Sequence, residues 1–286
     1  HGHHRRQRQM CIRDSYYHRD WKAGVSNKIT VRNQNIDPYF DLMYYMGDAL
    51  PLQVDSTINT TEVSLETRFA FREKFLNGDF NRVSLGSKYP VFTLNYTWGL
   101  KGVLSSDFSY HKLELNISDK VNINPIGHFK YSLTAGKIFG TLPMLLLEVH
   151  EGNETYFYND GAFNLMNEYE FVSDAYATIR VSHHFDGFFF DKIPLIRKLK
   201  LRALVTGKAV IGTLTKDNEF TNSLNRGEEP YFINAEAPFP KPYVEVGVGI
   251  ENIIRFFRID GIWRLTYLNN PHIKGFGIRA GMELNF

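Results

Sequence analysis

The serine and histidines at Ser182, His183 and His184 form the first group in the chain that could support chemistry. A serine hydroxyl beside an imidazole is the arrangement that nucleophilic hydrolases use. Neighbouring side chains of a strand point to opposite faces, so only one of the two histidines can meet Ser182. The chain has no G-x-S-x-G turn, the motif that presents the nucleophile in α/β-hydrolases. An outer-membrane lipid hydrolase that uses Ser182 with His183 or His184 is therefore kept as an alternative hypothesis.

Two other groups of residues invite a cofactor or metal interpretation. His150, Glu151 and Glu154 carry ligand atoms but lack close ligand spacing on one element. Gly247 and Gly249 form G-x-G inside an apolar strand with no helix after it, which is not a dinucleotide-binding loop. We expect these glycines to let neighbouring groups pack closely. We therefore expect no catalytic residue, no cofactor and no metal.

The first fifteen residues, HGHHRRQRQMCIRDS, differ from the rest of the chain. The run RQRQMCIRDS resembles translated sequencing-adapter read-through, and we interpret residues 1–15 as a non-native tail. The alternative is a natural basic tail, or a metal-binding tract built on His1, His3 and His4. Four arginines and one aspartate give the tail a charge of +3, so the net charge of +2 becomes −1 for residues 16–286. This balance gives no argument for a nucleic-acid partner.

The only cysteine, Cys11, lies in the same tail. Residues 16–286 therefore cannot form a disulfide framework or a thiolate metal site. Aromatic residues make up 15% of the chain. That share suits a barrel with aromatic girdles, and it also suits a large soluble sandwich.

Alternation of apolar and polar residues recurs along residues 16–286, and helical periodicity is scarce. Side chains of a strand alternate between the two faces of a sheet, so each alternating run predicts a strand. About eleven runs qualify. They are 28–33, 62–72, 91–98, 111–117, 129–135, 163–171, 178–182, 199–206, 244–251, 257–267 and 276–286.

Strand length favours a membrane barrel over a soluble sandwich. Most of the predicted strands approach the roughly 9–11 residues that a tilted strand needs to cross a bilayer, whereas soluble strands have about five or six. Counting strands back from the C-terminus puts the long connection 214–242 outside, as barrels of this class require. The same count puts 140–161 and 186–198 on the periplasmic side. We predict an all-β, antiparallel transmembrane β-barrel with about ten to twelve strands, with a soluble β-sandwich binding module as an alternative.

Charged residues of both signs gather on the polar faces of the last strands. A water-filled or ion-paired lumen would accommodate them, either as a structural salt network or as a surface that lines a substrate path. Phe286 would be the aromatic end of the last strand, the kind of C-terminus that outer-membrane assembly machinery recognises. The predicted lumen-facing network consists of Glu245, Glu251, Arg258, Asp260, Arg264, Arg279 and Glu283.

Several segments in order resemble an uncharacterised family of Gram-negative outer-membrane proteins. They include RVSLGSKYPVFTLNY, GKIFGTLP, NETYFYNDGAFNLMNEYEFVSD and PYVEVGVGIENI. Members of that family usually carry an N-terminal carboxypeptidase-regulatory-like domain before a C-terminal barrel. The closing pattern RIDGIWRLTYL…GFGIRAGMELNF is more weakly similar to the bacterial surface-antigen superfamily of assembly factors.

The resemblance implies that residues 16–286 are the C-terminal portion of a barrel whose upstream strands are missing. It implies the cell outer membrane as location, with outer-membrane lipids and the assembly machinery as partners. It brings no catalytic residue with it. We therefore expect a non-catalytic role in translocation, assembly or anchoring of envelope components.

Overall fold

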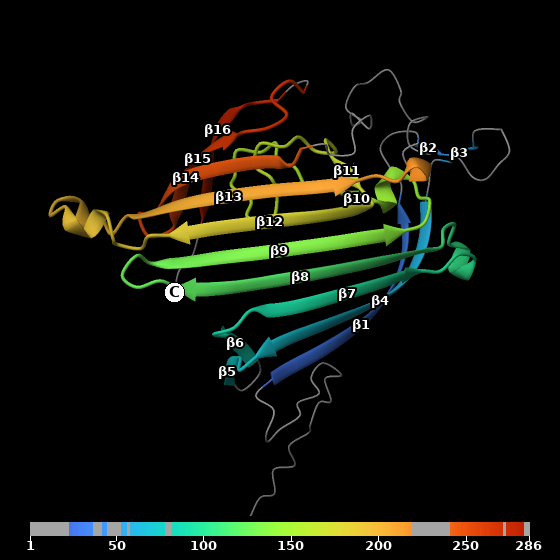
Figure 1. The fold of residues 1–286 in the computed structure, drawn as a ribbon, viewed down its shortest axis with the longest axis horizontal. Coiled ribbons are helices and arrows are strands. Elements are labelled where there is room, and N and C mark those ends of the chain that lie inside the picture. The colour runs from blue at the N-terminus through green and yellow to red at the C-terminus, as the bar shows by residue number, and fades with distance from the viewer. Residues whose placement is uncertain are drawn as a thin grey trace, which may run out of the picture.

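A computed structural model describes residues 23–36, 42–44, 53–55, 58–77, 82–218, 241–270 and 273–282. The predicted all-β class and the antiparallel pairing are confirmed, and the largest unit is a ten-stranded sheet (Figure 1). The predicted tail 1–15 lies outside the described residues. In spatial order the sheet contains β1 (Ala23–Ile36), β4 (Ile58–Phe71), β7 (Val91–Gly99), β8 (Tyr110–Asn122), β9 (His128–Phe139), β12 (Ala175–His184), β13 (Arg202–Thr213), β14 (Tyr243–Ile253), β15 (Phe257–Arg264) and β16 (Phe276–Met282).

The remaining elements are short and lie in the connections. Three two-stranded ribbons pair β2 (Leu42–Tyr44) with β3 (Gln53–Asp55), β5 (Lys74–Asn77) with β6 (Arg82–Gly86), and β10 (Glu148–Val149) with β11 (Val172–Ser173). The 3-10 helices are η1 (Val103–Ser105), η2 (Met144–Leu146), η3 (Phe190–Lys192) and η4 (Ile196–Leu199). No helix among the described residues has the length and apolar character needed to span a membrane.

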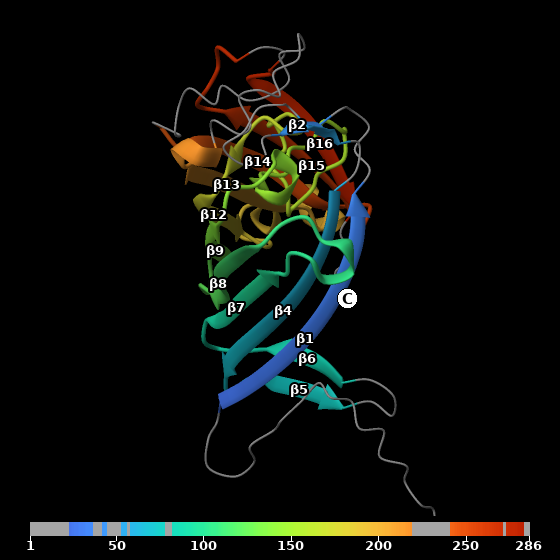
Figure 2. The same ribbon diagram turned by 90° about the vertical axis from the view of Figure 1, so that its right-hand side faces the viewer.

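The sheet is an up-and-down meander, because each strand pairs with the strand that follows it in the sheet's chain order. Figure 2 shows that the sheet is curved, with β1 and β4 bending along their length. Within the described residues β1 pairs only with β4, and β16 pairs with no other strand of the sheet than β15. The described sheet therefore has two edges and is not a closed barrel.

Ten of the predicted strand segments coincide with the strands of this sheet. The prediction for 163–171 is wrong, because this stretch is irregular. Its alternation does not separate a buried from an exposed side, because Phe163, Asn164 and Leu165 are all buried. Two of its backbone amides, at Asn164 and Leu165, bond to the carboxylate of Glu245 instead of a strand ladder.

Because 163–171 is not a strand, one strand fewer separates the earlier connections from the C-terminus, and the end of the sheet assigned to residues 140–161 changes. Residues 140–174 form one connection from β9 to β12, and it emerges at the end of the sheet where β7, β13 and β15 also end. We call this the long-loop end. The prediction that 140–161 shares an end with 186–198 is therefore wrong, since 186–198 lies at the opposite end.

The two faces of the sheet have the reverse of a soluble protein's polarity. On β14 and β15, Val248 is 54% exposed and Ile259 is 48% exposed, whereas Glu245 is 2% exposed and Asp260 is fully buried. Monomeric soluble proteins rarely expose large contiguous apolar patches or bury so many charges. We call the two surfaces the apolar face and the polar face.

Candidate functional site: the polar face and its covering segment

Residues 140–174, which we call the covering segment, fold back from the long-loop end onto the polar face. Figures 1 and 2 show the irregular part of this segment beside β13–β16. Two buried apolar clusters join the segment to the sheet. One contains Phe163, Met166, Phe171, Val210 and Tyr243.

Lys208 and Glu245 are register partners on β13 and β14, and both are almost completely buried. The ammonium of Lys208 donates to the backbone carbonyls of Asn159, Asp160 and Ala162 at 2.9, 3.0 and 2.6 Å. The Glu245 carboxylate accepts two backbone amides, at 2.9 and 3.1 Å. Burying a charge is costly unless hydrogen bonds compensate it, so these contacts fix the segment to the sheet.

Two arginines extend this anchorage across β15 and β16. Arg264 makes a bidentate pair with Glu170 of the covering segment at 2.9 and 2.6 Å and also donates to the Leu165 carbonyl. Arg279 Nη2 donates to the carbonyls of Asn164 at 2.6 Å and Asn153 at 3.3 Å. Both guanidinium groups therefore bind main-chain oxygen of the segment.

Arg258 and Asp260 form a bidentate pair along β15, with Nε–Oδ2 and Nη2–Oδ1 distances of 2.6 and 2.9 Å. The ring of Tyr158, from the covering segment, lies 3.8 Å from the Arg258 guanidinium carbon. A Cβ at Gly249 would lie 2.4 Å from Asp260 Oδ1, which confirms that this strand glycine allows close packing.

The covering segment also reaches the edge of the sheet. Tyr158 N donates to Ala280 O at 2.7 Å, and Ala280 N donates to Tyr156 O at 2.9 Å. Phe157 thereby forms a parallel bridge with Ala280 on β16. Residues 156–158 therefore cover part of an edge that would otherwise present unpaired backbone groups.

The structure brings most of the predicted network together on the polar face, and Glu251 lies apart, near the opposite end of the strands. Glu283 and Phe286 lie outside the described residues. The sequence prediction missed Lys208 because the predicted strand ended at residue 206, whereas β13 continues to Thr213. It missed the role of Glu170 because that residue was assigned to a strand of its own.

Ser182, His184 and Glu251 form a relay. Ser182 Oγ lies 3.3 Å from His184 Nε2, and His184 Nδ1 lies 3.0 Å from Glu251 Oε2. His183 points to the other face, where its Nε2 lies 3.1 Å from the carbonyl oxygen of Ile126. His184 also stacks on His128 with ring centroids 4.6 Å apart. The relay has the connectivity of nucleophile, base and orienting carboxylate.

His150, Glu151 and Glu154 do not converge. His150 is buried with Nε2 2.5 Å from Ser173 Oγ, whereas Glu151 and Glu154 are exposed. No group of three acidic, histidine or cysteine ligands occurs in the part of the chain that the structure describes.

His150 and Glu148 of the covering segment have displaced pKa values. Burial, and secondly the positive charge of Arg180, lower the pKa of His150 to about 4. Burial, and secondly the carboxylate of Glu114, raise the pKa of Glu148 to about 7. As pH falls, protonation of His150 opposes the docked segment, whereas protonation of Glu148 favours it.

Glu245→Gln should loosen the covering segment without unfolding the sheet. The amides of Asn164 and Leu165 lose a charged acceptor, a loss of about 1.5–3 kcal/mol. Hydrogen exchange at these two amides should accelerate by about tenfold or more. Glu251→Gln is the matched control, because Glu251 is equally buried on β14 but bonds His184. Equal acceleration in both variants would contradict the assigned anchorage.

His150→Gln should reduce the acid sensitivity of the fold. The folded pKa of about 4 lies below the ordinary 6.5, so His150 contributes stability above pH 6.5 that is lost as pH falls towards 4. By pH 4 the wild-type chain should lose about 3 kcal/mol of unfolding free energy more than the variant. Denaturant titrations of both proteins from pH 7.5 to 4 measure the difference, and Glu148 contributes to both curves alike. Parallel curves would refute the buried neutral state.

Comparison with protein-family models gives one match, over residues 20–224, to the C-terminal domain of a family of unknown function (DUF5686). No curated protein matches the chain. The matched range includes β1 to β13 and the whole covering segment. Since it spans more than half of the 286 residues, the chain belongs to the DUF5686 family through the C-terminal domain of that family.

Proposed function

We propose that this chain is an outer-membrane β-barrel protein that translocates, assembles or anchors envelope components without catalysis. The observation that carries the proposal is the reversed polarity of the sheet, with an exposed apolar face and a buried charged face. In a transmembrane barrel the apolar face meets lipid and the polar face lines the interior. The soluble β-sandwich alternative would leave that apolar face in water.

Aromatic residues on the apolar face support a bilayer position, because they form a row at each end of the strands. The strand registers place the long-loop row and the opposite row on either side of aliphatic residues such as Leu94, Leu115 and Val248. Barrels carry aromatic girdles at both membrane interfaces. The long-loop row contains Trp98, Phe139, Trp263 and Phe276, and the opposite row contains Phe69, Phe92, Phe129 and Phe257.

The spacing of the two rows fits a membrane. On β9, Phe129 and Phe139 are ten positions apart, which corresponds to about 33 Å along a strand. A strand tilted by about 45° would cover about 23 Å of membrane thickness over this distance, close to the apolar band of about 25 Å in known barrels.

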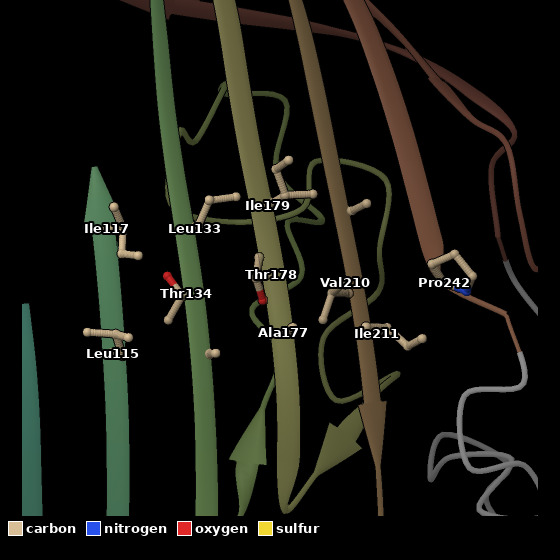
Figure 3. A pocket seen from close by; sticks show the side chains of 12 residues that line it. Leu115, Ile117, Leu133, Thr134, Ala177, Thr178, Ile179, Val210, Ile211 and Pro242 are labelled. Carbon is tan, nitrogen blue, oxygen red and sulfur yellow. The ribbon is translucent and has the colours of Figure 1, made fainter. Parts of the chain in front are cut away.

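A shallow apolar depression of about 330 Å³ lies on the same face, across β8, β9, β12 and β13 (Figure 3). Large side chains such as Leu115, Leu133 and Ile179 stand around it, and Ala135 and Ala177 face each other across β9 and β12. No charged residue lines it. Lipid acyl chains are the partner that suits such a surface, so we propose outer-membrane lipids and the outer-membrane assembly machinery as partners.

Hydrolysis of a lipid ester is the second candidate function, and the Ser182–His184–Glu251 relay favours it. Ser182 Oγ would attack the ester carbonyl while its proton passes to His184 Nε2, and Glu251 would hold the imidazole. His184 would then protonate the leaving alcohol, and water would release the acyl group. The non-catalytic proposal stands first because the same contacts satisfy a buried histidine without any reaction.

Val248→Arg should destabilise the protein in a bilayer by about 2–4 kcal/mol if Val248 faces mid-membrane lipid. Ile254→Arg is the matched control, because Ile254 is more exposed, at 75%, and lies in the β14–β15 turn. At an interface the same substitution costs only about 0–1 kcal/mol. Unfolding titrations in lipid vesicles compare the two variants. Equal small effects, or a wild-type protein that stays soluble without detergent, would refute the membrane position.

Ser182→Ala tests the second candidate function. If the relay is catalytic, hydrolysis of a chromogenic ester by the detergent-solubilised protein should fall by about 10³-fold or more. Glu251→Gln should lower the rate too, since the imidazole loses its orienting carboxylate. Activity that survives Ser182→Ala, or its absence from the wild-type protein, would remove the hydrolase hypothesis.

A further inference from the structure

We infer that Lys208, Glu245, Arg264 and Arg279, which we call the cradle, form a binding site for a polypeptide backbone. The covering segment occupies this site in the structure. The inference rests on the proposed translocation or assembly role and names its substrate class as unfolded polypeptide.

The cradle binds main-chain atoms almost throughout. Lys208 donates to three backbone carbonyls, Arg279 to two in the covering segment, and Arg264 to one there. Glu245 accepts two backbone amides. The side-chain contacts are the pair between Arg264 and Glu170 and the ring of Tyr158 beside Lys208. Main-chain groups are the same in every sequence, so most of these contacts do not depend on which residues occupy the site.

The edge of the sheet adds a second contact of the same kind. Residues 156–158 pair with Ala280 of β16 through two backbone hydrogen bonds. Adding a strand to a sheet edge is a general mode of peptide recognition. Cradle and edge together hold a stretch that runs from Asn153 to Leu165, and both hold it through its backbone.

The buried charges of the cradle need an occupant that offers backbone carbonyl and amide groups. All four side chains are at least nine-tenths buried, and leaving a buried charge unpaired is strongly unfavourable. An occupant has to offer carbonyl oxygens to three cations and amide donors to one carboxylate. A polypeptide backbone supplies both groups along its length, whereas lipid chains and simple ions do not.

The covering segment leaves donor capacity unused. Within the described residues, Arg279 Nε and Arg180 Nε are buried without a hydrogen-bond partner. Buried donors are usually satisfied, so a different backbone could bind the same surface at least as well. The segment therefore acts as an internal competitor that a passing chain displaces.

A reversible disulfide between the covering segment and β16 tests whether a peptide competes with the segment. Phe157→Cys and Ala280→Cys, combined with Cys11→Ser, place two cysteines at the parallel bridge, where a disulfide can form. The probe is a fluorescent, unstructured Gly-Ser-Ala peptide as long as the 153–165 stretch. Its binding to the detergent-solubilised chain is followed by anisotropy. The reduced protein should bind the peptide, and oxidation should weaken binding by about tenfold or more. The Cys11→Ser protein alone should show no redox effect.

Two further variants distinguish the contribution of the cradle from that of the covering segment. Tyr158→Ala removes the ring that packs on Arg258 and Lys208, so it should free the intact cradle and strengthen peptide binding. Lys208→Met should weaken peptide binding although it also loosens the segment. Equal affinity in the oxidised and reduced proteins, or no peptide binding even by Tyr158→Ala, would overturn the inference. The bilayer comparison of Val248→Arg with Ile254→Arg is independent, so failure of the membrane proposal is distinguishable.

Discussion

Pairing of buried charge is the constraint on which the rest of this structure depends. The polar face carries charges of both signs from β13 to β16, and the fold removes them from water. Such charges are tolerated only when ion pairs and hydrogen bonds compensate them. The covering segment supplies that compensation through Glu170 and its own backbone. Sheet and segment therefore stabilise each other, and neither is a complete unit alone.

The same constraint explains why the opposite face is apolar. A strand has only two faces, so placing the polar residues inside directs every second residue outwards. Val248 and Ile259 are exposed for this reason. The result is an apolar exterior that carries a row of aromatic side chains at each end of the strands.

Alternation allowed the sheet to be predicted from the sequence, because each long strand carries its own pattern. The same rule failed at 163–171, where Phe163 and Leu165 alternate with polar residues although no strand forms. In a strand, alternation marks one buried side, whereas here the polar Asn164 is buried as fully as its apolar neighbours, through side-chain hydrogen bonds within the segment. Its partner, Glu245, is 81 residues from Asn164 in the chain. No local pattern encodes that contact, so the covering role could not be predicted.

For the predicted charge network, the sequence indicated which face of the sheet the residues share, but it did not indicate which residues pair with one another. Asp260 and Arg279 both belong to the predicted network and are register partners, since neighbouring strands in a meander are also neighbours in sequence. Arg264 pairs instead with Glu170, and Glu251 pairs with His184. These long-range pairs depend on where the covering segment and the curved sheet bring side chains together. Strand periodicity indicates neither the position of the covering segment nor the curvature of the sheet.

The direction in which the apolar face points is tested most directly by tryptophan quenching in vesicles. Trp98 and Trp263 both lie on that face and are exposed, and Trp21→Phe removes the tryptophan outside the described residues. We predict strong quenching by lipids with brominated acyl chains and little quenching by aqueous iodide. Strong quenching by iodide with none by brominated lipids would contradict a lipid-facing apolar surface.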